Sequence, residues 1–87
     1  MYKTLGIIGG MGPEATCDLM RKIIDFTAAA RDQEHLHMIA DVNTAIPDRT
    51  AAILRGGDDP LPELLESGKR LEEAGADFLV ISCNTAH

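Results

Sequence analysis

The residues best suited to chemistry in this 87-residue chain lie in the segment 82–87, SCNTAH. It follows a continuous apolar run at 78–81, FLVI, which predicts a buried strand. A thiol at the end of such a strand lies at the sheet edge near the start of the next helix, where its pKa can fall below about 8.5. A lone cysteine is usually buried and inert, but the polar neighbours Asn84 and Thr85 favour a site at Cys83, because polar groups there need partners.

A glycine-rich turn is the second candidate. Residues 10–15, GMGPEA, follow an apolar run and formally match the dinucleotide fingerprint G-x-G-x-x-A. Two residues count against a nucleotide, since Pro13 has no amide hydrogen to donate to a pyrophosphate and Glu14 adds negative charge beside the ligand. No Gly-Lys-Ser or Gly-Lys-Thr is present, which excludes a P-loop. The turn therefore serves either close helix packing or the binding of a small carboxylate by backbone amides.

Asp48 and Arg49 form the third candidate. A guanidinium at the edge of a sheet in an acidic protein can bind a carboxylate through two parallel hydrogen bonds. Asp48 can equally be the N-cap of a short helix over 49–55 that leaves Arg49 in solvent. Both interpretations stay open at the level of the sequence.

Hydrophobic patterning predicts the elements that position these segments. Strands are expected over 4–9, 37–42 and 77–82, and helices over 13–30, 49–55 and from 59 to Gly75. Strands that alternate with helices pair in parallel through right-handed crossovers. We therefore expect an α/β fold in which a parallel sheet has helices on both faces, as in Rossmann-like or flavodoxin-like lobes. Ligands of such sheets bind beyond the carboxyl ends of the strands, where all three candidate segments fall.

The two cysteines are expected to play different parts. Cys17 lies on the apolar side of the first predicted helix, among residues at helical spacing, and is expected in the core. Two cysteines are too few for a disulfide scaffold, so both should be free thiols. The three histidines have no metal-ligand spacing with a cysteine or with one another, so no metal site is predicted.

Composition limits the classes of partner. The net charge is −6 and the 8 lysines and arginines are scattered, which argues against nucleic acid. No apolar run is long enough for a transmembrane helix, and the N-terminal run is too short for a signal peptide, so a cytoplasmic location is expected. A three-stranded parallel sheet is a weak unit by itself. We therefore expect the chain to be the first part of a larger domain or to need a partner chain.

Three motifs in order along the chain together resemble the aspartate/glutamate racemase family. They are GGMGP with AT at 9–16, IPDRT at 46–50 and SCNTAH at 82–87. The resemblance implies racemisation of an acidic amino acid without pyridoxal phosphate or another cofactor, by two cysteines on opposite faces of the substrate α-carbon. It also implies a homodimer, and it makes residues 1–87 the first lobe of a two-lobe protein whose second lobe, with the second cysteine, is absent here.

The resemblance assigns roles residue by residue. Cys83 would be one of the two acid/base thiols. Asn84 and Thr85, with backbone amides near Met11, would hold the α-carboxylate, and Arg49 would reach the side-chain carboxylate. The 87 residues alone are then expected to have little or no activity, because Cys17 on the first helix is a poor substitute for the missing cysteine.

Other functions remain open. Related enzymes with a cysteine at this position include hydantoin racemase, maleate isomerase and arylmalonate decarboxylase, although the Arg49 motif favours an acidic amino acid as substrate. A non-catalytic module that binds carboxylates or assembles with another chain is a different class, and dinucleotide binding is a third. The motifs do not choose between aspartate and glutamate.

Overall fold

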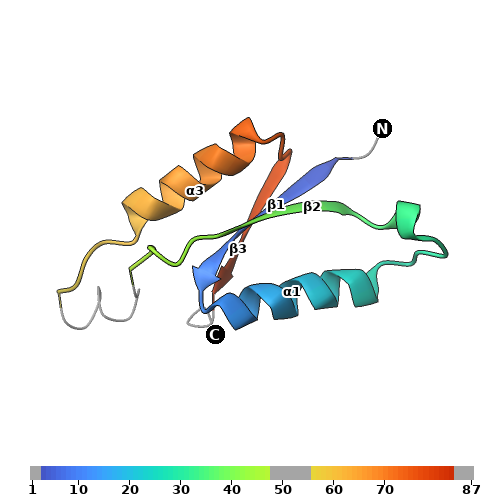
Figure 1. Cartoon of the computed structure of the whole chain (residues 1–87), viewed down its shortest axis with the longest axis horizontal. Helices are drawn as coiled ribbons and strands as arrows, with labels where there is room; N and C mark the ends of the chain where they lie inside the picture. The colour runs from blue at the N-terminus through green and yellow to red at the C-terminus, as the bar shows by residue number, and fades with distance from the viewer. Residues whose placement is uncertain (1–2, 48–55, 84–87) are drawn as a thin grey trace.

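The computed structural model describes residues 3–47 and 56–83, except for the side chains of Met11 and Cys83. Along the chain, β1 spans Thr4–Met11, α1 Pro13–Phe26, a 3-10 turn Asp32–Glu34, β2 His37–Val42, α3 Leu61–Glu73 and β3 Phe78–Cys83 (Figure 1). This order of elements confirms the α/β fold. The short helix predicted over 49–55 lies outside the described residues.

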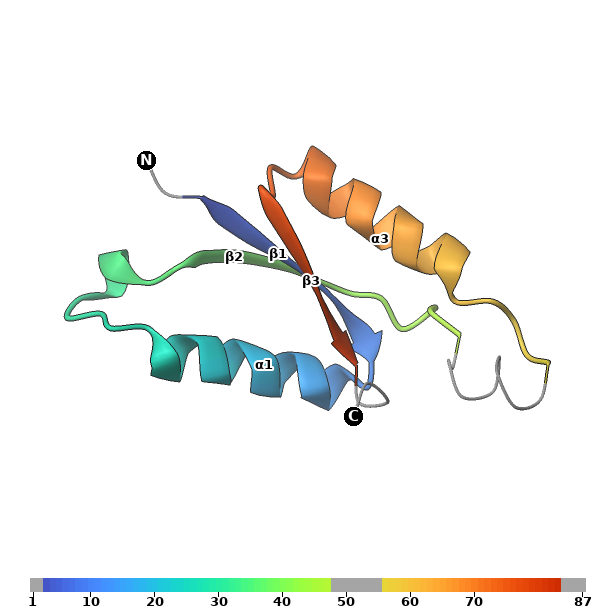
Figure 2. The same ribbon diagram turned by 180° about the vertical axis from the view of Figure 1, so that it is seen from behind.

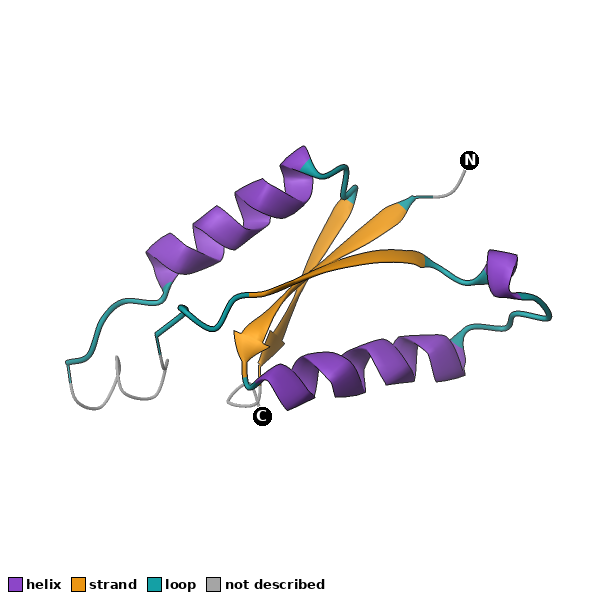
Figure 3. Ribbon diagram, viewed as in Figure 1, coloured by secondary structure: helices purple, strands orange, loops and turns teal. Residues whose placement is uncertain are grey.

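The sheet is parallel, with strand order β2-β1-β3. The chain leaves β1 in one direction to form β2 and then crosses to the other side of β1 to form β3. Crossovers between parallel strands are right-handed as a rule, so this reversal is expected to place α1 and α3 on opposite faces of the sheet. Figures 2 and 3 show the two helices on either side of the three strands, as the sequence predicts.

The central strand β1 alternates between the two helices. Ile8 faces α3 and forms the core there with Ile46 and Leu71. On the other face Ile7 is completely buried, and Thr16 of α1 packs directly beneath Gly9. Neighbouring residues of a strand point to opposite faces, so both helices depend on this one strand for their packing.

Several element boundaries differ from the prediction, since α3 begins at Leu61 rather than 59 and β3 spans Phe78–Cys83 rather than 77–82. The helix expected to reach residue 30 ends at Phe26, because Thr27 is extended and its hydroxyl donates to the Ile23 carbonyl at 2.6 Å. That bond satisfies one of the last helical carbonyls. The first strand, expected to stop at residue 9, continues to Met11. The third helix ends as predicted, with Gly75 just beyond it at φ 103°.

The prediction that Cys17 lies in the core is wrong. Cys17 is exposed, whereas its neighbour Thr16 is fully buried. Successive helical residues are about 100° apart around the axis, so a helix that turns Thr16 toward β1 leaves Cys17 at its side, where the thiol is exposed. Within residues 3–47 and 56–83, no helix has the length and hydropathy needed to cross a membrane.

Candidate functional site

The ends of β1 and β3 meet at the carboxyl edge of the sheet. The β1–β3 register pairs Ile8 with Ile81 and then Met11 with Cys83. Between these two pairs β1 advances by three residues and β3 by only two. The extra residue of β1 forms a β-bulge. This bulge lies in the glycine turn and brings the backbone of Met11 beside that of Cys83. Two of the predicted site residues are thus neighbours across the ladder.

The turn after β1 needs glycine at defined places. Gly10 has φ 107° and Gly12 has φ 88°, a region that side chains disfavour. The α-carbon of Gly10 also lies against the backbone of Asn43, where a β-carbon would come 2.7 Å from the Asn43 nitrogen. The close approach of β1 to the end of β2 is therefore possible only with glycine.

Helix α1 begins directly after this turn. Gly12 is its N-cap and offers no side-chain hydrogen bond, Pro13 stands in the first turn, and Glu14 is exposed. Pro13 has no amide hydrogen, and the Ala15 amide donates to the Gly12 carbonyl at 3.1 Å. The rest of the first turn has no capping side chain, so a carboxylate can accept from it at the carboxyl edge. Pro13 and Glu14 lie in the first turn of α1, as the sequence predicts. The missing amide hydrogen of Pro13 and the negative charge of Glu14 therefore both disfavour a pyrophosphate at this turn.

Asn43 joins the ends of three elements, a role that the sequence analysis missed. It is 8% exposed, and its backbone amide donates to the Gly9 carbonyl at 2.9 Å. Its side-chain nitrogen donates to Ser67 Oγ at 2.9 Å and to Glu63 Oε1 at 3.0 Å, both on α3. Its side-chain oxygen accepts the Ala45 amide at 3.0 Å. The position of an asparagine directly after a strand was the one signal available in the sequence.

The remaining predicted site residues lie outside the described part of the chain. These are Arg49, Asn84 and Thr85, together with Asp48. Described residues lead to Arg49 as far as Pro47, and the backbone of Cys83 is the last described point before Asn84. The assignment of these residues, and of the Cys83 thiol and the Met11 amide, to a site stays a prediction.

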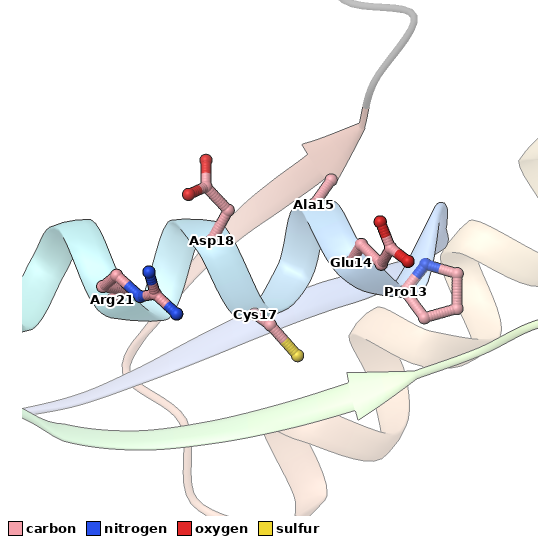
Figure 4. A pocket seen from close by; sticks show the side chains of 6 residues that line it. All are labelled: Pro13, Glu14, Ala15, Cys17, Asp18 and Arg21. Carbon is pink, nitrogen blue, oxygen red and sulfur yellow. The ribbon is translucent and has the colours of Figure 1, made fainter.

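A surface depression of about 590 Å³ lies along the first turns of α1 (Figure 4). Its lining consists of Pro13, Glu14, Ala15, Cys17, Asp18 and Arg21. All six come from one helix, so the depression brings together none of the predicted site residues. The described residues contain no cluster of three or more histidine, cysteine or acidic side chains that could hold a metal ion.

Comparison with known proteins gives consistent results. The family model for Asp/Glu/Hydantoin racemase matches residues 8–87. A Bacillus subtilis protein described as broad specificity amino-acid racemase RacX is 30% identical over 89 residues, an alignment that covers 95% of this chain and 37% of that protein. The solved structure of Picrophilus torridus aspartate racemase is 39% identical with a TM-score of 0.89, covering 98% of this chain and 37% of the other. The chain thus spans little more than a third of the length of these relatives.

Proposed function

Because this chain belongs to the Asp/Glu/hydantoin racemase family, we propose that the whole protein interconverts the L and D forms of aspartate or glutamate. The reaction needs no pyridoxal phosphate in this proposal. Both similar proteins described above are named as amino-acid racemases, and one of them as an aspartate racemase. The observation that carries the proposal is the register that sets Met11 beside Cys83 at the carboxyl edge.

We also propose that residues 1–87 form the first lobe of a two-lobe protein. The share of the relatives that is matched, 37%, supports this division. The exposed apolar edge of β3 supports it as well, because a doubly wound sheet buries such a strand between neighbours. The second lobe would carry the second cysteine and close the site over the carboxyl edge. A homodimer in the cytoplasm belongs to the same proposal.

The proposed chemistry is a proton transfer between two thiols across the substrate α-carbon. The thiolate of one cysteine takes the α-proton as the Cα–H bond breaks, and the electron pair stays on carbon as a carbanion. The thiol of the other cysteine then delivers its proton to the opposite face and becomes the thiolate. Cys83 would be one member of this pair. A thiol with a pKa near 8 supplies both protonation forms near neutral pH.

The substrate carboxylates would be held by donors at the same edge. Amides near Met11 and the side chains of Asn84 and Thr85 would bind the α-carboxylate, and Arg49 would bind the side-chain carboxylate. Hydrogen bonds to the α-carboxylate also stabilise the charge that develops on the α-carbon. Contributions on the order of 3 kcal/mol per donor are typical of such sites. The uncapped first turn of α1 is compatible with an anion at this position.

The test is exchange of the α-proton of aspartate and glutamate in deuterated water, followed by proton NMR. The 87-residue chain is expected to show no exchange, and a longer chain that includes these residues is expected to exchange and racemise. Cys83→Ala in the longer chain should lower the rate by about 100-fold or more, which is the usual scale for loss of an acid/base group.

Cys17→Ala is the matched control, because Cys17 is exposed in a depression lined by α1 alone. It should leave the exchange rate unchanged. Exchange that survives Cys83→Ala would overturn the role of Cys83. Activity on hydantoins or maleate in place of amino acids would reassign the substrate, and stabilisation by aspartate with no exchange in any chain would indicate a carboxylate-binding module.

A further inference from the structure

Asn43 satisfies every hydrogen-bonding group of its side chain with protein partners. The side-chain nitrogen has two hydrogens, which go to Ser67 and Glu63, and the side-chain oxygen accepts from Ala45. Ser67 is completely buried, and the residue Asn43 itself is nearly so. The orientation of the amide follows from these partners, because the reversed amide would place its oxygen against the Glu63 carboxylate.

The backbone of Asn43 holds the two segments that flank the proposed site. Its amide donates to Gly9 at 2.9 Å, and its peptide group lies against the α-carbon of Gly10. Its carbonyl accepts the Ile46 amide at 3.3 Å, which closes the turn that leads toward Arg49. One residue therefore fixes both the glycine turn and the start of the segment with the predicted guanidinium.

The side chain connects these two segments to helix α3. Glu63 and Ser67 are one helical turn apart on α3 and both accept from the same nitrogen. Helix α3 is in turn fixed to the sheet by Leu71, which is 2% exposed in the core with Ile8. Asn43 is therefore attached to a helix that is itself packed on the sheet. A change at Asn43 would shift the glycine turn relative to this helix.

We propose that Asn43 is a positioning residue, which anchors the glycine turn and the start of the segment after β2 to α3 and so holds the backbone donors of that turn in place for the α-carboxylate. Asn43 touches no substrate in this proposal, which rests on the proposed racemase function. Backbone donors bind a carboxylate tightly only when they are held in one geometry, so a displaced glycine turn should weaken substrate binding.

The decisive variant is Asn43→Asp in the full-length protein that carries these residues. Aspartate keeps the oxygen that accepts from Ala45 and has nearly the same shape, but it places a second carboxylate against Glu63. The two carboxylates then repel each other at the position where the Asn43 amide donated a hydrogen bond to Glu63. We expect KM for the substrate to rise about tenfold or more while kcat changes by less than about threefold, because binding geometry is disturbed and the acid/base groups are not.

The double variant Asn43→Asp/Glu63→Gln restores a donor, since the glutamine amide can give its hydrogen to the new aspartate. It should return KM to within about threefold of the unchanged protein. Glu63→Gln alone keeps an acceptor for Asn43 and should change little. Ile7→Val is the control for a general loss of stability, because Ile7 is fully buried on the α1 side and has no part in this network.

Hydrogen exchange of the backbone at 9–12 and 43–46 gives a readout that is independent of catalysis. Both segments should exchange at least about tenfold faster in Asn43→Asp and recover in the double variant. Equal acceleration in Ile7→Val, no recovery with Glu63→Gln, or an unchanged KM would overturn the proposal. If the unchanged protein shows no racemisation, the proposed function fails, and the exchange data alone decide whether Asn43 anchors the two segments.

Discussion

The two outer strands of the sheet are secured in opposite ways. Around β2 the contacts are polar and directional, with Asp41 bound to Arg70 of α3 at 3.1 Å and Asn43 bound to Glu63 and Ser67. Along β3 four consecutive apolar residues, Phe78 to Ile81, are 36–57% exposed. Polar contacts define one geometry, whereas exposed apolar surface is stabilised by any well-packed cover. The contacts around β2 therefore hold the end of that strand in one geometry relative to α3.

Strand β3 is hydrogen-bonded to β1 along one edge, and its other edge has no neighbouring strand among the described residues. At its start, the Thr4 amide donates to the Asp77 carboxylate at 2.8 Å and the Asp77 amide donates to the Thr4 carbonyl at 2.7 Å. An apolar groove of about 420 Å³ follows β3 and α3, lined by Ile8, Leu61, Leu64, Leu65, Gly68, Lys69, Glu72, Leu79 and Ile81. An uncovered edge strand of this kind favours pairing with further chain. This agrees with the proposal that more of the domain lies beside it.

The largest expected effect tests how closely β1 and β2 fit together. Gly10→Ala should lower the free energy of unfolding by about 3 kcal/mol or more, because it combines an unfavourable φ with overlap on the Asn43 backbone. Gly75→Ala is the matched control, since Gly75 has nearly the same φ, 103°, and nothing within 4 Å of its added β-carbon. It should cost about 1 kcal/mol. Equal costs in urea unfolding would show that the contact with Asn43 adds nothing.

A smaller effect tests the difference between the edges directly. The 87-residue chain is expected to self-associate through β3, and Ile81→Lys should weaken that association about tenfold, or about 1.4 kcal/mol, by charging an edge strand. Val42→Lys places the same charge on β2 at a residue of similar exposure, 46% against 57% for Ile81. It should leave association unchanged in sedimentation equilibrium. Identical behaviour of the two variants would remove the distinction between the edges.

The smallest effect concerns the turn that leads into β2. The Ala30 amide and then the Arg31 side chain hold the pKa of the exposed Glu34 carboxyl below its usual 4.5. A lowered folded-state pKa means that this contribution to stability is present above the unfolded-state value and is lost as pH falls through the folded-state value. Arg31→Gln should raise the pKa of Glu34 in a carbon-13 NMR titration, but leave it below 4.5 because the Ala30 amide remains.

Lys22→Gln is the control for the change in net charge, because Lys22 pairs with Asp18 on α1 at 3.0 Å and not with Glu34. It should leave the titration of Glu34 unchanged. A pKa of Glu34 that stays fixed in Arg31→Gln would show that the Arg31 side chain adds nothing to the hydrogen bond from the Ala30 amide.

The sequence determined the three strands, the helices α1 and α3 and their order, because strand and helix periodicities are local properties. It also indicated the edge where chemistry would occur, since Gly10, Gly12 and Cys83 follow apolar runs that end there. It did not determine how α1 is rotated. The apolar stripe of α1 is broad, and only the fit of Thr16 beneath Gly9 turns Cys17 outward.

The tertiary structure decided the contacts between residues far apart in the chain. The bulge that pairs Met11 with Cys83 depends on the register of two strands 72 positions apart, which no local pattern specifies. The joining of Asn43 to Glu63 and Ser67 depends on where α3 lies over the sheet. The physical reason is the same in both cases. Hydrogen bonds act over about 3 Å, and only the packed fold brings such distant residues within that range.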